Sequence, residues 1–260
     1  MALNEHNLFY KSEICTLIQD DSLKVLEDIK PESIDMIFAD PPYFLSNNVI
    51  TCQGGKMVSV NKGSWDRLSD NGTSIEEKHK FNRKWIKLCK KVLKPNGTIW
   101  ISGTMHNIYS VGMALEQEGF KIINNITWQK TNPPPNLACR CFTHSTETIL
   151  WAQKNDKKSH HFFNYELMKT LNAGKQMKDV WTGSLTKPSE KKCGKHPTQK
   201  PEYLLERIIQ ASTVPGDIVL DPFCGSGTTG VVANRLGRNF IGIDLSEEYL
   251  QITKKRLEAI

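Results

Sequence analysis

The sequence predicts an α/β fold, a doubly wound parallel sheet with an antiparallel hairpin at its edge. Short apolar segments alternate with helical patterns along most of the chain, which is typical of strands joined by crossover helices. Two apolar segments end in unusual motifs, and loops at the carboxyl ends of strands are where such sheets bind ligands. The length of 260 residues suits one body with a modest embellishment.

Four segments are expected to be strands of this sheet, because each is short, apolar and bounded by Gly, Pro or Asp. In chain order they are Ile34 to Ala39, Thr98 to Ser102, Asp217 to Leu220 and Asn239 to Ile243. The first ends in Asp40-Pro41-Pro42, where proline keeps the chain out of helix and a loop begins. The segments expected to pair as the edge hairpin are Ile122 to Trp128 and Thr146 to Ala152.

Helical patterns alternate with these strands. The clearest are Ile75 to Leu93, Pro201 to Ala211, Thr228 to Leu236 and Ser246 to Leu257. In the last of them, Ser246 is expected to be the N-cap, with acidic residues in the first turn. Two stretches are expected to be loops, namely Phe44 to about Asp70 and the region after Pro135.

Composition excludes several classes of protein. Hydrophobic residues make up 38% of the chain and charged residues 24%, which fits a globular protein rather than a disordered one. No segment approaches the ~20 consecutive apolar residues that span a bilayer, and the amino terminus has no basic stretch before an apolar run. Seven cysteines, an odd number at irregular spacings, predict a reducing compartment. We therefore expect a cytoplasmic protein with no membrane partner.

The positive charge of the chain is concentrated in one segment. The formal net charge is +6, and residues 131–196 contain 11 Lys and Arg against 5 Asp and Glu. Such a segment fits a polyanion, because affinity for nucleic acid depends largely on neutralised phosphates. A solvated lysine-rich loop explains the charge equally well.

A glycine-rich motif follows the third expected strand and begins a helix. The motif runs from Asp221 to Gly230 and contains Pro222, Phe223, Cys224, Gly225, Ser226, Gly227, Thr228 and Thr229. Its glycines allow close approach of the backbone to a ligand, and Asp244 ends the next strand, where a carboxylate can bind ribose hydroxyls. The motif alone fits a nicotinamide or flavin enzyme as well as any other enzyme that binds an adenosine cofactor.

Asp221 indicates which of these cofactors the motif binds. A carboxylate just before the glycine turn is unfavourable beside a pyrophosphate but favourable beside an ammonium or sulfonium group, which are the charges of S-adenosylmethionine. The alternative is that Asp221 caps the helix at Thr228 or accepts hydrogen bonds from loop amides.

Asp40-Pro41-Pro42-Tyr43 predicts the chemistry. The exocyclic amine of adenine or cytosine is a poor nucleophile, because its lone pair is delocalised into the ring. The Asp40 carboxylate and a backbone carbonyl can each accept one N–H and free the lone pair for attack on a methyl group. Tyr43 offers a face on which an extruded base can stack. The alternative is an ordinary turn at the end of a strand.

In these motifs and their order the chain resembles the beta class of DNA amino-methyltransferases. The resemblance implies a Rossmann-like methyltransferase sheet, S-adenosylmethionine as cofactor and double-stranded DNA as substrate. It also implies a cofactor site in which Asp21, with Asp20 as the alternative, binds the adenine and Asp244 the ribose. The residues implied for the methionine end of that site are Phe223, Gly225 and Gly227, and Asp221, Ser226 and Thr228 of the same motif are also expected to bind the cofactor.

Two further segments are similar to segments of the same class. In His196-Pro197-Thr198-Gln199-Lys200-Pro201, the resemblance implies that Thr198 and Lys200 bind the cofactor's carboxylate. In Trp128-Gln129-Lys130, it implies that Trp128 contacts the other side of the flipped base. Residues 1–130 would form the catalytic half, 131–195 the target-recognition region, and 196–260 the cofactor-binding half of the same sheet.

The resemblance implies a site-specific methyltransferase of a restriction system. Asp at the head of the catalytic loop is usual in adenine-specific members, so N6 of adenine is the expected target. The length of the chain also resembles that of MboII-type enzymes. A cognate restriction endonuclease would share the recognition site without direct contact, and a homodimer is one option for the oligomer. The alternatives are cytosine N4, an RNA base or a protein glutamine as acceptor, and a silent nucleic-acid-binding module.

A zinc site is not expected. The cysteines and histidines that could be assembled into one are Cys139, Cys141, His144, Cys193 and His196. A C-x-C spacing is not that of the usual zinc sites, and His196 belongs to the segment described above. No metal is therefore predicted.

Overall fold

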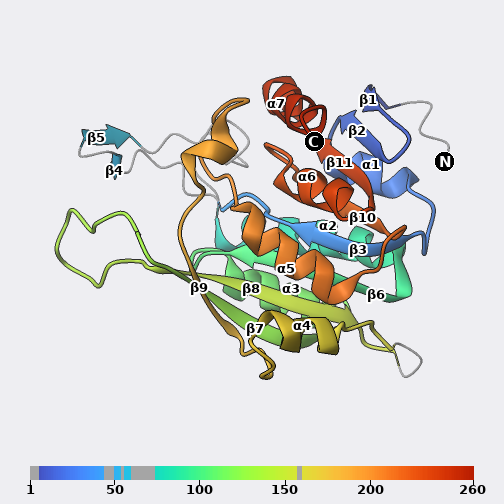
Figure 1. Ribbon diagram of the computed structural model, residues 1–260, viewed down its shortest axis with the longest axis horizontal. Helices are drawn as coiled ribbons and strands as arrows, with labels where there is room; N and C mark the ends of the chain where they lie inside the picture. Colours follow the sequence, from blue (N-terminus) through green and yellow to red (C-terminus); the bar gives the residue numbers. More distant parts are fainter. Residues whose placement is uncertain (1–5, 44–49, 54–55, 60–73, 157–159) are drawn as a thin grey trace.

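The computed structural model describes residues 6–43, 50–53, 56–59, 74–156 and 160–260 (Figure 1). In these ranges, nine strands form one sheet in the order β1-β2-β11-β10-β3-β6-β8-β7-β9, and two others pair separately. None of the helices in these ranges combines the length and hydropathy needed to span a bilayer.

Five parallel strands form the centre of the sheet. They are β2 (Cys15–Gln19), β11 (Asn239–Asp244), β10 (Ile218–Asp221), β3 (Ile34–Ala39) and β6 (Leu93–Gly103). The four strands predicted from the sequence are confirmed. The largest difference is in β6, which begins five residues before the predicted Thr98, because its first residues pair with Ile34.

Antiparallel strands extend this centre on both sides. β1 (Leu8–Lys11) pairs with β2, and β8 (Thr146–Lys154) lies between β6 and β7 (Phe120–Lys130), antiparallel to both. The predicted hairpin of β7 and β8 is confirmed, but its predicted place at the edge is wrong. β9 (Val180–Gly183) adds outside β7, where Trp181 is buried beside Trp100.

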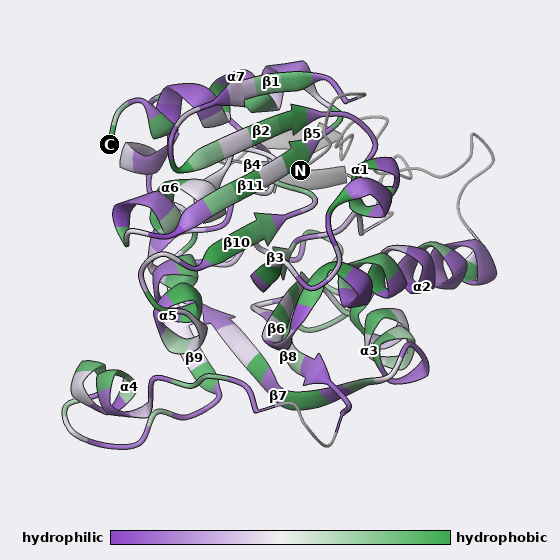
Figure 2. Cartoon of the chain, turned by 90° about the vertical axis from the view of Figure 1, so that its right-hand side faces the viewer, coloured by the Kyte–Doolittle hydropathy of each residue, from purple (hydrophilic) through white to green (hydrophobic). Residues whose placement is uncertain are grey.

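Helices cover both faces of the sheet, as Figure 2 shows. One face carries α1 (Ser22–Asp28), α2 (Ile75–Val92) and α3 (Ile108–Gln117). The other carries α4 (Tyr165–Leu171), α5 (Glu202–Ser212), α6 (Thr228–Arg235) and α7 (Glu247–Leu257). Strand residues alternate between the two cores, since Ile99 and Ile101 pack with the first group and Trp100 with the second.

The four predicted helices are confirmed, and polar side chains fix where two of them begin. Ser74 and Glu77 form a capping box at the start of α2, in which each side chain bonds the other residue's backbone N–H. Ser246 is the N-cap of α7, as predicted, and its Oγ accepts from the Tyr249 N–H at 3.3 Å.

The stretch predicted to be a loop after Phe44 contains a small hairpin. β4 (Ile50–Gln53) and β5 (Lys56–Ser59) pair antiparallel, with Gln53 opposite Lys56. The sequence between them is Gly54-Gly55, a dipeptide typical of two-residue hairpin connections. The prediction of a loop is therefore wrong for β4 and β5. The rest of the stretch, residues 44–49 and 60–73, lies outside the described residues.

The basic segment 131–195 is partly framework. It supplies β8 and β9 to the sheet and α4 to one face, and it also contains the short 3-10 helix η2 (Pro188–Lys191). The connection from β7 to β8, residues 131–145, projects from the left side of the view in Figure 1. The predicted role of the segment in target recognition stays a prediction.

Candidate active site

The carboxyl ends of four neighbouring strands bring four aspartates together. Asp221 and Asp244 are the last residues of β10 and β11, Asp40 follows β3, and Asp21 lies two residues after β2. Because these strands are parallel neighbours, their ends meet at one edge of the sheet. All four residues line one cavity of about 710 Å³, a volume within the range of small-molecule sites.

The same cavity contains most of the predicted site. The other predicted residues that line it are Pro42, Thr198, Lys200, Phe223, Gly225, Ser226 and Thr228. Pro41, Tyr43, Trp128 and Gly227 are not among its lining residues. The two motifs, about 180 positions apart in the sequence, therefore form the walls of a single site.

Two glycines of the motif are required by close packing. Gly227 is the N-cap of α6 in the left-handed conformation, with φ of +70°, and a Cβ there would lie 2.3 Å from Thr253 Cγ2. A Cβ at Gly230 would lie 2.5 Å from Phe240 Cδ1 of β11. Gly227 thus permits the turn, and Gly230 permits the helix to pack against the sheet.

Asp221 is a buried carboxyl whose contacts are all within the turn. Its Oδ1 accepts from the Phe223 N–H at 3.0 Å, and its Oδ2 accepts from Thr229 Oγ1 at 2.6 Å. Burial raises the pKa of Asp221 to about 7, although these two hydrogen bonds lower it. The alternative given for Asp221, hydrogen bonding to loop amides, describes these contacts, yet the residue also lines the cavity.

Asp244 is fixed by the backbone on both sides. Its Oδ2 accepts from the Gly225 N–H and its Oδ1 from the Ser246 N–H, both at 2.8 Å. Burial raises the pKa of Asp244 above its usual value. Each carboxylate oxygen has a second lone pair, so the side chain can still accept hydrogen bonds from a ligand.

Asp21 and Asp20 differ in their surroundings. Asp21 lines the cavity and caps α1 by accepting from the Leu23 N–H at 2.9 Å. Asp20 is paired with His6 Nδ1 at 2.9 Å, and the pKa of Asp20 is lowered, first by this hydrogen bond. Asp21 is therefore the better placed of the two for a ligand.

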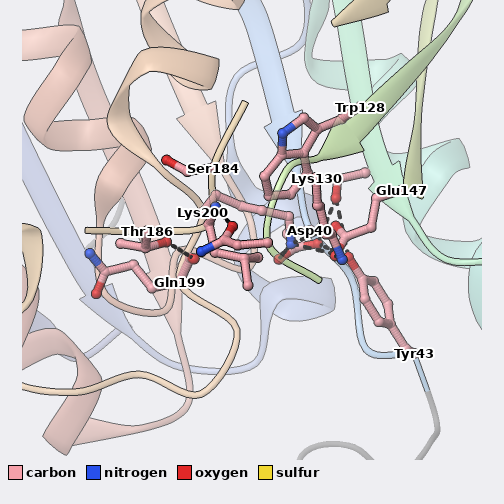
Figure 3. Close-up of polar contacts among 12 residues, drawn as sticks. Asp40, Tyr43, Trp128, Lys130, Glu147, Ser184, Thr186, Gln199 and Lys200 are labelled. Atoms are coloured by element: carbon pink, nitrogen blue, oxygen red, sulfur yellow. Dashed lines mark hydrogen bonds and ion pairs between the residues drawn. The ribbon is translucent and has the colours of Figure 1, made fainter. Parts of the chain in front are cut away.

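Asp40 is held by three donors, of which Tyr43 and Lys200 are labelled in Figure 3. Its Oδ1 accepts from Tyr43 Oη at 2.5 Å and from Ser102 Oγ at 2.9 Å, and its Oδ2 accepts from Lys200 Nζ at 2.5 Å. Tyr43 lies against the same centre, since its Oη is 3.1 Å from both Ser102 Oγ and Lys200 Nζ. A charged donor and two neutral ones thus fix the orientation of the carboxylate.

Lys200 joins Asp40 to a second buried carboxylate. Its Nζ is 3.5 Å from Glu147 Oε2, and Glu147 Oε1 is 2.7 Å from Lys130 Nζ. Burial lowers the pKa of Lys200, but the carboxylates of Asp40 and Glu147 outweigh it, and the pKa lies well above its usual value. Burial raises the pKa of Glu147, but the two lysines hold it below its usual value. Two carboxylates and two ammonium groups thus form a balanced chain of charge.

The family of the chain can now be compared with this geometry. A family model described as DNA methylase, which covers N6 and N4 amino-methyltransferases, matches residues 34–255. The chain belongs to this family. The match includes both motifs and the segment between them, and it confirms the predicted resemblance.

Two relatives of this DNA methylase carry the names of restriction systems. The chain is 70% identical to Type II methyltransferase M2.LlaDCHI of Lactococcus lactis subsp. cremoris over 99% of its own length and 97% of the relative's. It is 72% identical to Type II methyltransferase M2.DpnII of Streptococcus pneumoniae over 96% and 92%. Neither relative is named after the MboII system, to which the sequence analysis compared the chain.

A solved structure confirms the predicted fold of the methylase. The M1.HpyAVI–SAM complex aligns with a TM-score of 0.68 and 31% sequence identity, over 94% of this chain and 98% of that one. The Rossmann-like methyltransferase sheet predicted from the sequence is therefore confirmed.

Three predicted residues of the methylase have surroundings that differ from the expected ones. Lys200, expected to bind the cofactor's carboxylate, points its ammonium at Asp40. Tyr43 is 5% exposed and Trp128 only 1%, and Trp128 Nε1 donates to Tyr203 Oη at 2.7 Å. In this conformation neither ring offers a face to the cavity, so their stacking roles stay predictions.

Four residues of the site were missed from the sequence. Ser102, Lys130 and Glu147 contact the centre around Asp40, and Tyr249 lines the cavity edge-on to His196 with ring centroids 4.3 Å apart. Only Glu147 gave a signal, as a lone acid at the start of an apolar strand inside the basic segment. β8 runs antiparallel to β6, which places its first residues at the carboxyl edge of the parallel strands.

The residues discounted as zinc ligands form no site in the described part of the chain. Cys139 and Cys141 are exposed and Cys193 is partly buried. Among the described residues, no group of three or more His, Cys, Asp or Glu is placed to hold a metal ion.

Proposed function

We propose that this DNA methylase transfers a methyl group from S-adenosylmethionine to N6 of an adenine in double-stranded DNA, as the modification enzyme of a restriction system. One observation carries the proposal: the catalytic Asp40 and the aspartates of the glycine motif line the same cavity. The family match and the Type II relatives support DNA as the substrate. Asp rather than Ser at the head of the loop favours adenine over cytosine.

The residues around the cavity fit S-adenosylmethionine. Asp221 is a buried carboxyl that accepts from two neutral donors, the Phe223 N–H and the Thr229 hydroxyl, so an ammonium or sulfonium group would supply a compensating charge. Asp244 and Asp21 both line the cavity, and we assign Asp244 to the ribose hydroxyls and Asp21 to the adenine amine. Thr198 remains the candidate for the carboxylate, because Lys200 is engaged by Asp40. The bound cofactor supplies the electrophilic methyl group.

The residues of the chain prepare the amine for attack. Asp40 accepts one N–H of the target amine, and the Pro41 carbonyl accepts the other, so that the nitrogen lone pair leaves the ring system. Ser102, Tyr43 and Lys200 hold Asp40 in one orientation before substrate arrives.

The direct test is to identify the modified base. The protein is incubated with labelled S-adenosylmethionine and duplex DNA of mixed sequence, and the DNA is digested to nucleosides. We expect all label in N6-methyl-2′-deoxyadenosine. Label in N4-methylcytosine would show the second candidate, which the family also includes and the same loop chemistry serves. Label in RNA or protein alone would contradict the proposal.

Cofactor affinity should depend on pH through Asp221. The pKa of this carboxyl is about 7, and a cation can be paired only with its ionised form. Below pH 7 binding must first ionise the group, so we expect Kd to rise by up to about tenfold per pH unit from pH 7 to pH 5.5. Calorimetry in two buffers of different ionisation enthalpy should detect release of close to one proton at pH 6.

A matched pair of variants isolates the contribution of Asp221. Asp221→Asn should bind the cofactor more weakly at pH 7.5 and lose the pH dependence. Asp217 is the control, because burial raises its pKa too but it lies outside the cavity. Asp217→Asn should keep the wild-type dependence, and an unchanged dependence in Asp221→Asn would show that another group titrates.

A further inference from the structure

The loop of residues 131–145 begins and ends at the catalytic centre. The Lys130 N–H donates to the Ser145 carbonyl at 2.7 Å and closes the base of the loop. Just inside this base, Lys130 Nζ contacts Glu147, and Glu147 contacts the lysine that holds Asp40. A chain of three ion pairs therefore links the base of the loop to the catalytic carboxylate, at the same edge of the sheet.

One phenylalanine of this loop is exposed to solvent. Phe142 is 96% exposed, the highest value among the exposed large hydrophobic side chains of the described residues. Exposed apolar side chains are common singly, so exposure alone assigns no role. What distinguishes Phe142 is that its loop starts at the catalytic centre and projects away from the body (Figure 1).

The turn that carries Phe142 is organised by its own contacts. Asn136 Nδ2 donates to the Cys141 carbonyl at 2.7 Å, and Asn136 Oδ1 accepts from the Ala138 N–H at 3.1 Å. The three prolines at 133–135 fix φ before the turn. Ordering the loop in advance reduces the entropy that binding would otherwise cost.

The distance of Phe142 from the sheet is large enough for its side chain to reach into a groove of DNA. Phe142 is four residues from Thr146, where β8 begins, and four extended residues span up to about 14 Å. The major groove of B-DNA is about 8.5 Å deep. Extruding a base leaves its neighbours without a stacking partner, and apolar side chains such as Phe are used as wedges between base steps.

We propose that Phe142 enters the duplex at the position vacated by the target base and stacks on the bases beside it, which stabilises the extruded state. The proposal rests on the proposed function, since it requires a duplex from which a base is removed. It assigns to this loop the opening of the duplex rather than the reading of its sequence.

The test compares a paired and an unpaired target base. Phe142→Ala, Phe142→Trp and the wild type are assayed on a matched duplex and on one in which the target base faces an abasic site. Tyr109→Ala is the matched control, because Tyr109 is an aromatic residue that is 76% exposed and belongs to α3 rather than to the loop. The same proteins are mixed with duplex containing 2-aminopurine at the target position, whose fluorescence rises when the base is unstacked.

We expect Phe142→Ala to lower kcat/KM on the matched duplex by about 10- to 100-fold, which is the range of one lost base–aromatic stacking contact. On the abasic duplex the loss should be under threefold, because extrusion there costs little. The 2-aminopurine signal should fall with Phe142→Ala and stay with Phe142→Trp. Tyr109→Ala should match the wild type throughout, and all three variants should unfold at the wild-type urea midpoint.

Other outcomes overturn the proposal. An equal loss on both duplexes would make Phe142 a general binding residue, and no loss on the matched duplex would leave the ring for another partner, such as a protein. Wild-type protein that methylates cytosine instead of adenine would correct the target base and leave the Phe142 comparison valid on an unpaired cytosine. Wild-type protein that methylates no DNA would overturn the proposed function, and this proposal with it.

Discussion

Asp40→Asn should lower kcat by at least about 10³-fold while leaving DNA binding intact. The amide keeps the size of the carboxyl, but one of its two acceptor oxygens becomes an NH2 donor, and the remaining oxygen has no negative charge and accepts an N–H from the target amine more weakly. Losing one positioned transition-state hydrogen bond costs about 10² to 10³ in rate, and here the negative charge is lost as well. Single-turnover assays with saturating DNA and cofactor measure the chemical step directly.

The control removes a carboxylate that is remote from the site. Glu116 is exposed on α3, and Glu116→Gln should keep wild-type kcat. DNA affinity of Asp40→Asn, measured by fluorescence anisotropy, should stay within a few fold of wild type, because the variant removes no positive charge. A kcat reduced less than tenfold would mean that Asp40 is not the acceptor for the target amine.

The framework was predictable because the strands of this sheet are encoded locally. A parallel strand buried on both faces is a short apolar run, and Ile34–Ala39 and Asn239–Asp244 both have this form. β9 could not be predicted in the same way. It is four residues long, and only Trp181 within it is buried. Its place in the sheet depends on tertiary packing beside Trp100, which no local pattern records.

The meeting of Asp221 and Asp244 at one edge of the sheet was predictable for a related reason. Asp221 and Asp244 each end a strand, and parallel topology places such residues together without any further information. The partners of Asp40 could not be found in this way. Glu147 lies on an antiparallel strand, where the first residue rather than the last reaches the functional edge. Lys200 lies between Asp40 and Glu147 only because the fold brings these three residues together. The sequence motif around Lys200 predicted a different partner, the carboxylate of the cofactor.

Lys200→Met should destabilise the fold by about 3 to 5 kcal/mol, because it leaves Asp40 and Glu147 as buried carboxylates without their shared cation. The loss should also depend on pH. Lys200 helps to hold the pKa of Glu147 down, so without it that pKa would rise. A carboxyl whose folded pKa lies above its unfolded value stabilises the fold at low pH, and this contribution is lost as pH rises. The urea midpoint of the variant should therefore increase from pH 8 to pH 5.5 relative to wild type.

A double variant distinguishes lost charge pairing from lost packing. In Asp40→Asn with Lys200→Met the unpaired carboxylate of Asp40 is gone, so the double variant should be more stable than Lys200→Met alone, although both lack activity. Lys24→Met is the control, because this lysine is 70% exposed and its pairing with Asp20 is worth little. If Lys200→Met and the double variant were equally unstable, and neither responded to pH, Lys200 would stabilise the fold by packing. Asp40 would then depend on Ser102 and Tyr43 alone for its orientation.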